Sequence, residues 1–224
     1  MYKLIPFSQI KENSTELILE IAEGNIGLEY LLNSCVEYDI DTYSSCGDVH
    51  PYISFIINDK NQDILYNLCL LILENFNISD CTSVKIEAVD GNNLCTIKYY
   101  DGSFINPEQF FIIVDVYLRK CKTAIINKDI SIFQDVNEMV KKIYSYGFNN
   151  CMEIFKSIYD DDGTFEYHLT IHGTNYKKIQ DFQKKAFTYA FEEYRNIGND
   201  YSICYYIEDL KQFQKGSKTL VRKK

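Results

Sequence analysis

Acidic turns that contain glycine constrain the fold of this chain more than any other feature of its sequence. Asp90-Gly91-Asn92-Asn93 separates the segments 84–89 and 94–100, in which apolar and polar residues alternate. An Asp-Gly pair between alternating segments is a strong signal for a β-hairpin, because both residues tolerate the positive φ of a tight turn. A second acidic turn, Asp160-Asp161-Asp162-Gly163, gives the same signal later in the chain.

Apolar residues at helical spacing alternate with these strand segments. Leu28, Leu31, Leu32 and Cys35, for example, form one apolar face. This spacing predicts helices over 15–23, 25–38, 61–76, 107–122, 132–146 and 175–196. Period-two alternation predicts strands over 41–45, 51–57, 84–89, 94–100, 151–159, 164–171 and 201–207.

Both halves of the chain therefore follow the order helix, strand, strand, helix, strand. This order predicts an α+β fold with two ferredoxin-like lobes, or one continuous mixed sheet with helices on one face. The expected division is a first lobe over 1–105 and a second lobe over 106–210, linked by the helix 107–122. Residues 211–224 are expected to form a basic, mobile tail.

The charge of the chain is unevenly distributed. Six of the 23 basic residues follow position 210, and all 32 acidic residues precede it, so the body carries 17 basic against 32 acidic residues, a net charge of −15. An acidic body repels phosphates and anionic membranes, so direct binding to nucleic acid or membrane is not expected. It suits a basic surface on a protein or ribonucleoprotein partner, although a purely solubilising role remains the simpler alternative.

The eight cysteines include no Cys-x-x-Cys pair, and the amino-terminal residues lack the apolar core of a signal peptide. No window reaches the roughly 18 apolar residues of a membrane span. A cytoplasmic protein with reduced thiols is therefore expected. Neither a cofactor nor a metal ion is expected, because the sequence contains no phosphate loop, dinucleotide fingerprint or four-ligand zinc pattern.

The loop between the first two predicted strands gathers the densest cluster of reactive side chains. Cys46 and His50 provide a thiol and an imidazole, which are the minimum for covalent catalysis, and the alternative is an ordinary turn. With Thr42, Ser45 and the segment Pro51-Tyr52-Ile53, this stretch is similar to a pattern in small uncharacterised bacterial and phage proteins. That resemblance implies no particular activity.

His168 and Thr170 form a His-x-Thr arrangement on a predicted strand. This arrangement resembles half of a two-histidine phosphoesterase site, in which two histidines act as general base and general acid. The comparable first-lobe strand, Tyr52-Ile53-Ser54, has no histidine in register. The enzyme alternative is a small-molecule or phosphoester-processing protein that uses the Cys46–His50 loop with His168 and Thr170.

The leading hypothesis is a non-catalytic acidic protein that occupies a basic surface of a macromolecular partner. Tyrosines beside carboxylates suit such an interface, because tyrosine supplies a large rigid area with a polar tip. Two patches are expected to bind the partner, one with Tyr99, Tyr100, Asp101 and Glu108, the other with Tyr205, Tyr206, Glu208 and Asp209. A phage- or mobile-element-encoded inhibitor of a nucleic-acid-guided defence enzyme, or an immunity protein, would have this profile.

Overall fold

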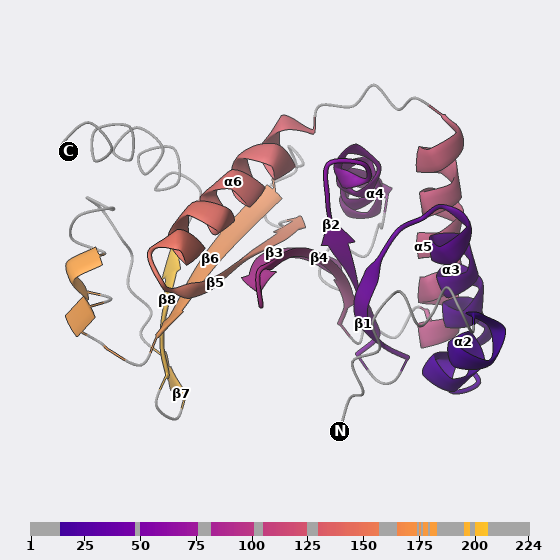
Figure 1. The fold of residues 1–224 in the computed structure, drawn as a ribbon, viewed down its shortest axis with the longest axis horizontal. Helices are drawn as coiled ribbons and strands as arrows, with labels where there is room; N and C mark the ends of the chain where they lie inside the picture. Colours follow the sequence, from indigo (N-terminus) through magenta and orange to yellow (C-terminus); the bar gives the residue numbers. More distant parts are fainter. Residues whose placement is uncertain are drawn as a thin grey trace.

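A single β-sheet runs through the structure (Figure 1). The computed structural model of the chain describes residues 14–47, 50–75, 82–100, 105–124, 130–156, 165–173, 195–197 and 200–205, together with positions 175, 177, 178 and 180–182. Within these residues eight strands form the order β1-β2-β4-β3-β5-β6-β8-β7. The strands are β1 (Thr42–Cys46), β2 (Tyr52–Ile57), β3 (Thr82–Val89), β4 (Asn92–Tyr99), β5 (Asn149–Lys156), β6 (Phe165–Gly173), β7 (Arg195–Ile197) and β8 (Asp200–Tyr205).

All of the described strand pairs are antiparallel. The predicted α+β class is confirmed, and the continuous sheet is the arrangement that the structure shows. The antiparallel pairing differs from the expected mixed sheet. It agrees with a ferredoxin-like split βαβ unit, because β4 lies between β2 and β3, which run in the same direction. Because β3 pairs with β5, the sheet continues across the expected boundary at 105/106. The division into two lobes stays a prediction.

The Asp-Gly turn forms the hairpin that the sequence predicts. β3 and β4 pair along their whole length, and the turn between them has φ of 50° at Asp90 and 80° at Gly91. Two successive positive φ values are the signature of a two-residue turn whose twist matches that of the flanking strands. The second predicted turn, 160–163, lies outside the described residues.

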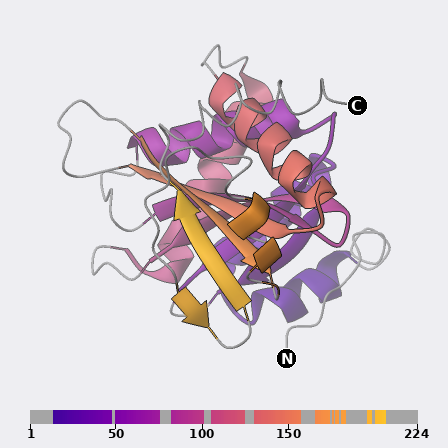
Figure 2. The same cartoon turned by 90° about the vertical axis from the view of Figure 1, so that its left-hand side faces the viewer.

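Helices cover one face of the sheet and extend beyond its β1 edge. The described helices are α2 (Ser14–Ala22), α3 (Ile26–Glu37), α4 (Gln62–Asn75), α5 (Pro107–Thr123) and α6 (Ser131–Ser145). α4 and α6 lie over the sheet, while α5, α3 and α2 form a stack beside β1 (Figure 1). The opposite edge of the sheet is formed by β8 and β7 (Figure 2). None of the described helices is long and apolar enough to cross a membrane.

The alternation of side chains gives the sheet two chemically different faces. The face toward α4 and α6 is apolar, and one row across it consists of Phe55, Cys95, Ile86, Met152 and Leu169, all fully buried. The row shifted by one residue lies on the other face and consists of Ser54, Thr96, Lys85, Glu153 and His168. A register error of one residue would exchange these rows, so burial of the apolar row fixes the pairing.

The helices α3 and α5 pack side by side and run parallel. Gly27 meets Glu108 near the first turn of each helix, and Ser34 meets Asp115 two turns further along. The Ser34 hydroxyl donates to the buried Asp115 carboxylate, which also accepts a bond from Arg119 Nε at 2.9 Å. These contacts fix the position of the α2–α3 pair relative to the rest of the molecule.

The carboxyl-terminal part of the chain contains the clearest error of the sequence prediction. The helix expected over 175–196 cannot reach its predicted end, because Arg195–Ile197 forms strand β7 and pairs with β8. Helical residues are described only at 177, 178 and 180–182. The apolar spacing of the segment favoured a helix and concealed the short hairpin that follows it.

Replacing Gly27 with alanine is expected to destabilise the protein. A Cβ at this position would lie 2.2 Å from the backbone oxygen of Glu108, so the two helices would have to separate. We expect a loss of about 1–3 kcal/mol in the free energy of unfolding, as for other overpacked interfaces. The measurement is chemical denaturation, with Asn33→Ala at an exposed site of α3 as the control. A Gly27→Ala protein as stable as the wild type would contradict this close approach.

The buried carboxylate of Asp115 gives a second prediction. Asp115→Asn is expected to lower the free energy of unfolding by about 1–3 kcal/mol, because the charge-assisted bonds from Ser34 and Arg119 lose their anionic acceptor. Thermal and chemical denaturation measure this loss. The exposed Asp135 on α6 provides the matched control, since Asp135→Asn should change stability by less than about 0.5 kcal/mol. Equal stability of the two variants would refute the role of Asp115.

Candidate functional site

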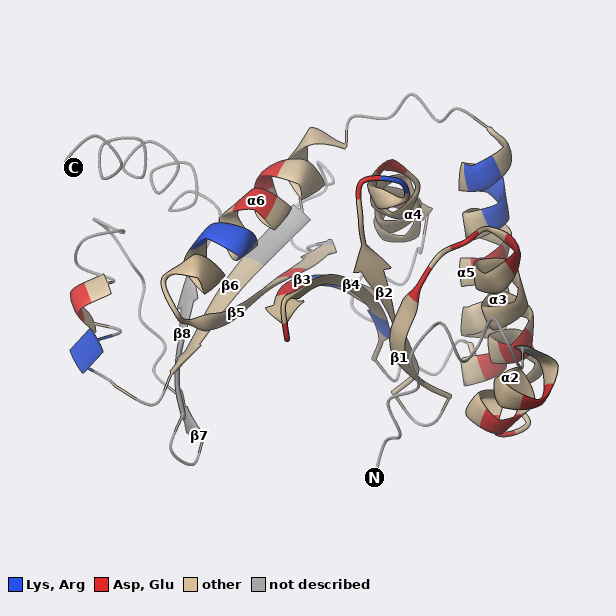
Figure 3. Ribbon diagram, in the orientation of Figure 1, with Lys and Arg blue, Asp and Glu red and all other residues tan. Residues whose placement is uncertain are grey.

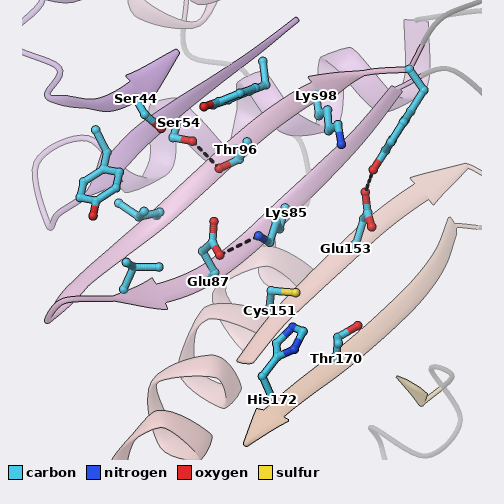
Figure 4. Close-up of a pocket in the computed structure, with 15 residues that line it drawn as sticks. Ser44, Ser54, Lys85, Glu87, Thr96, Lys98, Cys151, Glu153, Thr170 and His172 are labelled. Atoms are coloured by element: carbon cyan, nitrogen blue, oxygen red, sulfur yellow. Dashed lines mark hydrogen bonds and ion pairs between the residues drawn. The ribbon is translucent and has the colours of Figure 1, made fainter. Parts of the chain in front are cut away.

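The face of the sheet opposite α4 and α6 forms a cavity lined by polar side chains (Figure 4). The sheet arches in Figure 1, and this face lies on the inner side of the arch. The cavity has a volume of about 510 Å³. We call it the concave polar face, and its lining comprises Tyr43, Ser44, Tyr52, Ser54, Lys85, Glu87, Val89, Leu94, Thr96, Lys98, Tyr100, Cys151, Glu153, Thr170 and His172.

Strand β3 places one ion pair in the middle of the concave polar face. Lys85 and Glu87 are two residues apart and point to the same side, and Lys85 Nζ lies 2.7 Å from Glu87 Oε2. Their side chains retain 35% and 18% of their full exposure. Burial lowers the pKa of Lys85, but Cys151 and the carboxylates Glu87 and Glu153 raise it by more, so the net shift is upward. Lys85 therefore remains a cation at neutral pH.

Glu153 is held by two hydroxyl groups. Ser83 Oγ donates to Glu153 Oε1 at 2.6 Å, and the Tyr100 hydroxyl donates to the same oxygen. The ammonium of Lys98 lies 4.4 Å from the centroid of the Tyr100 ring. Burial, followed by the bond to Glu153, raises the pKa of Tyr100 to about 12, so its hydroxyl stays protonated and continues to donate.

Cys151 is the cysteine of this cavity, and it lies beside Lys85 and Thr170. Burial raises the pKa of its thiol to about 11, because desolvation outweighs the attraction of the Lys85 ammonium. Only the thiolate is an effective nucleophile. At neutral pH the concave polar face therefore presents a neutral thiol, which can make contacts with a ligand but is a poor attacking group.

The structure separates the residues of the enzyme alternative. His168 and Thr170 lie on β6, and Thr170 lines the concave polar face, while the His168 ring packs 4.8 Å from that of Phe155. Cys46 is half-buried at the end of β1, and four strands lie between β1 and β6. Thr170 thus lines the cavity at β6, whereas Cys46 lies at the β1 end of the same sheet, paired with the lining residue Tyr52 but not itself part of the lining.

The Cys46–His50 loop does not form a joined catalytic pair. His50 is exposed in a bend before β2, and among the described residues no hydrogen bond joins its ring to the Cys46 thiol. The carbonyl of Gly47 instead accepts a long bond of 3.4 Å from the side chain of Asn25, the residue that caps α3. This loop is therefore attached to the start of α3.

The first predicted partner-binding patch does not form one surface. Tyr99 is only 2% exposed and stacks on Phe110 in the core, which corrects the expectation that it is available to a partner. Tyr100 points to the opposite face of the sheet because neighbouring strand residues alternate. Glu108 is half-buried in the first turn of α5, and Asp101 lies outside the described residues.

The second predicted patch is largely outside the described residues. For Tyr205 only the backbone is described, and it pairs with Leu169 at the end of β8. Tyr206, Glu208 and Asp209 lie beyond it, as does the basic tail 211–224. Their role in binding stays a prediction.

Another set of acidic residues lies along the helices α2 and α3 (Figure 3). Between positions 14 and 41 the chain has seven carboxylates and no lysine, arginine or histidine. Three large apolar side chains are exposed among them, with 51% of Leu19, 48% of Ile26 and 53% of Tyr30 accessible. We define the acidic helical surface as Glu16, Leu19, Glu23, Ile26, Glu29 and Tyr30.

The sequence predicted neither the concave polar face nor the acidic helical surface as a site, for different reasons. Lys85, Glu87 and Glu153 were visible as charged residues at alternate positions of predicted strands, which usually indicates a solvent-facing side. Their convergence depends on the pairing of β3 with β5, which the sequence does not reveal. The acidic helical surface had a direct signal, because its carboxylates occur in a stretch without basic residues.

In the described residues no group of three or more His, Cys, Asp or Glu side chains is placed to hold a metal ion. No protein-family model, curated protein sequence or solved structure significantly matches the chain. A proposal for its function therefore depends on the chemistry of the surfaces described above.

The protonated state of Cys151 can be tested by alkylation. We expect iodoacetamide to modify Cys151 slowly at neutral pH, and the rate to rise with pH until about pH 11, because only the thiolate reacts. Peptide-resolved mass spectrometry measures the rate. Lys85→Met should slow the reaction further, since the ammonium lowers the pKa of this thiol, whereas Lys141→Met on α6 should not. A rate already maximal at neutral pH would reveal a reactive thiolate instead.

Proposed function

We propose that the chain is a non-catalytic binding protein whose acidic helical surface occupies a basic surface of a protein partner. The observation that carries this proposal is the coincidence of seven carboxylates, no basic residue and three exposed apolar side chains within positions 14–41. Either feature alone is common on protein surfaces. A specific charged interface requires both apolar side chains that supply affinity and charged side chains that select the partner, and this segment has both.

The apolar residues would supply most of the affinity. Leu19, Ile26 and Tyr30 are each about half exposed, and exposed apolar residues that are rimmed by polar residues can mark a protein interaction site. Side chains of this type act as anchors in protein interfaces, and their truncation commonly costs more than about 1 kcal/mol. They would insert between the basic side chains of the partner.

The carboxylates would select the partner and accelerate encounter. Complementary charge raises association rates and excludes partners of the same sign, although it adds less to net affinity. The net charge of −15 over residues 1–210 extends this attraction over the body of the protein. A basic surface that normally holds nucleic-acid phosphates has the required charge, so an inhibitor or immunity protein that masks such a surface is the form of this function that we favour.

Charge reversal on the acidic helical surface tests this function. The partner is first captured from lysate with the tagged chain at low salt and released at high salt, and is then purified for affinity measurements. We expect Glu16→Lys combined with Glu23→Lys to weaken binding about tenfold or more, and to reduce its salt dependence. Glu138→Lys, an exposed carboxylate on α6, is the matched control and should bind within about twofold of the wild type.

The apolar anchors and the enzyme alternative are tested with the same partner. Leu19→Ala and Tyr30→Ala should each weaken binding about fivefold or more, whereas Val116→Ala on the exposed face of α5 should not. Cys46→Ser and His50→Ala should leave binding unchanged. If the acidic and apolar variants bind as the wild type does, or if Cys46→Ser abolishes function in a folded protein, the proposal is wrong.

A further inference from the structure

The concave polar face is a second candidate site, and no residue of the acidic helical surface lines it. Its volume of about 510 Å³ falls within the range of about 300–1,000 Å³ that is usual for small-molecule sites. We propose that the concave polar face binds a small uncharged molecule that carries several hydroxyl groups on a ring, such as a saccharide or the sugar of a nucleoside. This inference is independent of the proposed function.

The charges of the cavity are balanced. Lys85 and Lys98 oppose Glu87 and Glu153, so these four side chains sum to zero. Neither a phosphorylated ligand nor a polyamine would gain a net electrostatic attraction there to offset the cost of desolvating its own charge. An uncharged ligand avoids this cost.

The cavity lining mixes hydrogen-bond donors and acceptors. Carboxylates such as Glu153 only accept, ammonium groups such as Lys98 only donate, and the hydroxyls of Ser44 and Thr170 do both. A ligand that engages this lining must donate and accept at closely spaced positions. A hydroxyl group does both with one atom, and a sugar ring places several hydroxyl groups next to one another.

The polar groups of the cavity are held in place by contacts within the protein. Ser83 and Tyr100 both donate to Oε1 of Glu153, which orients this carboxylate. Ser54 and Thr96 are joined at 2.7 Å between their hydroxyl oxygens. Groups fixed in this way lose little conformational freedom on binding.

Three tyrosines lie among the polar residues of the cavity. Tyr43, Tyr52 and Tyr100 belong to three different strands or strand ends and all contribute to the lining. An aromatic ring offers a flat apolar face beside a polar tip. A sugar ring has the matching construction, because its C–H groups form an apolar face and its hydroxyl groups form a polar edge.

Direct binding measurements test this inference on the full chain. The probes are maltose and cellobiose as saccharides, adenosine and uridine as nucleosides, and adenosine and uridine monophosphate as charged counterparts. Ligand-observed NMR and calorimetry report the dissociation constants. We expect at least one uncharged probe to bind with a dissociation constant below about 10 mM, and each nucleotide to bind more weakly than its nucleoside. Binding of saccharides alone or of nucleosides alone identifies the source of the hydroxyl-bearing ring.

Variants then locate the binding site. Glu153→Gln keeps the size of the side chain but removes its anionic acceptors, and should weaken binding about tenfold. Thr170→Val, from a different strand, should also weaken binding and remains informative if Glu153→Gln fails to fold. Glu138→Gln on α6 is the control. The inference is overturned if no uncharged probe binds, if the nucleotides bind more tightly than the nucleosides, or if both cavity variants in folded form bind as the control does.

Discussion

The pairing of β3 with two neighbours determines the arrangement of the whole molecule. Through β4 it connects to the amino-terminal strands, and through β5 it connects to the carboxyl-terminal strands. The alternation along β3 directs Val84 and Ile86 toward the helices and Lys85 and Glu87 toward the concave polar face. One strand therefore contributes to the core and to the cavity, and a shift of its register would disrupt both.

The helical stack depends on a different contact, the close parallel approach of α3 and α5. The absence of a side chain at Gly27 permits this approach, and the buried Asp115 carboxylate connects Ser34 with Arg119 across it. Within α3 the leucines are buried, while the side chains of Ile26 and Tyr30 are exposed. The acidic helical surface is thus held on a rigid support, which reduces the entropy lost when a partner binds.

Local sequence signals predicted the elements of this fold much better than their arrangement. The Asp90-Gly91 hairpin and the helices α2 to α6 lie within two residues of the predicted positions, since they depend on turn chemistry and apolar spacing. The prediction failed at Arg195–Ile197, where a short strand follows apolar residues at helical spacing. Strand order was not predictable, because the pairing of β3 with β5 depends on contacts between residues far apart in the sequence.

The dependence on contacts between residues far apart in the sequence also explains why the candidate sites were predicted less well than the helices and strands. Cys46 and His50 are candidates in the sequence because a thiol and an imidazole are reactive groups. Whether they act together depends on which residues surround them in space. Tyr99 and Tyr100 are adjacent in sequence, yet one lies in the core and the other in the cavity, because strand alternation separates them. In the sequence Lys85 and Glu153 are ordinary charged residues. They belong to a candidate site only because the pairing of β3 with β5 places them opposite each other.

Three groups of the concave polar face do not suit proton-transfer chemistry at neutral pH. A general acid or base needs a pKa near the working pH so that it can exchange a proton. Here the pKa of Cys151 is raised to about 11 and that of Tyr100 to about 12, while Lys85 is shifted further toward its cationic form. Each of these groups keeps one protonation state across the neutral range. Held charges and oriented hydroxyls of this kind fit the ligand binding that we propose for the concave polar face.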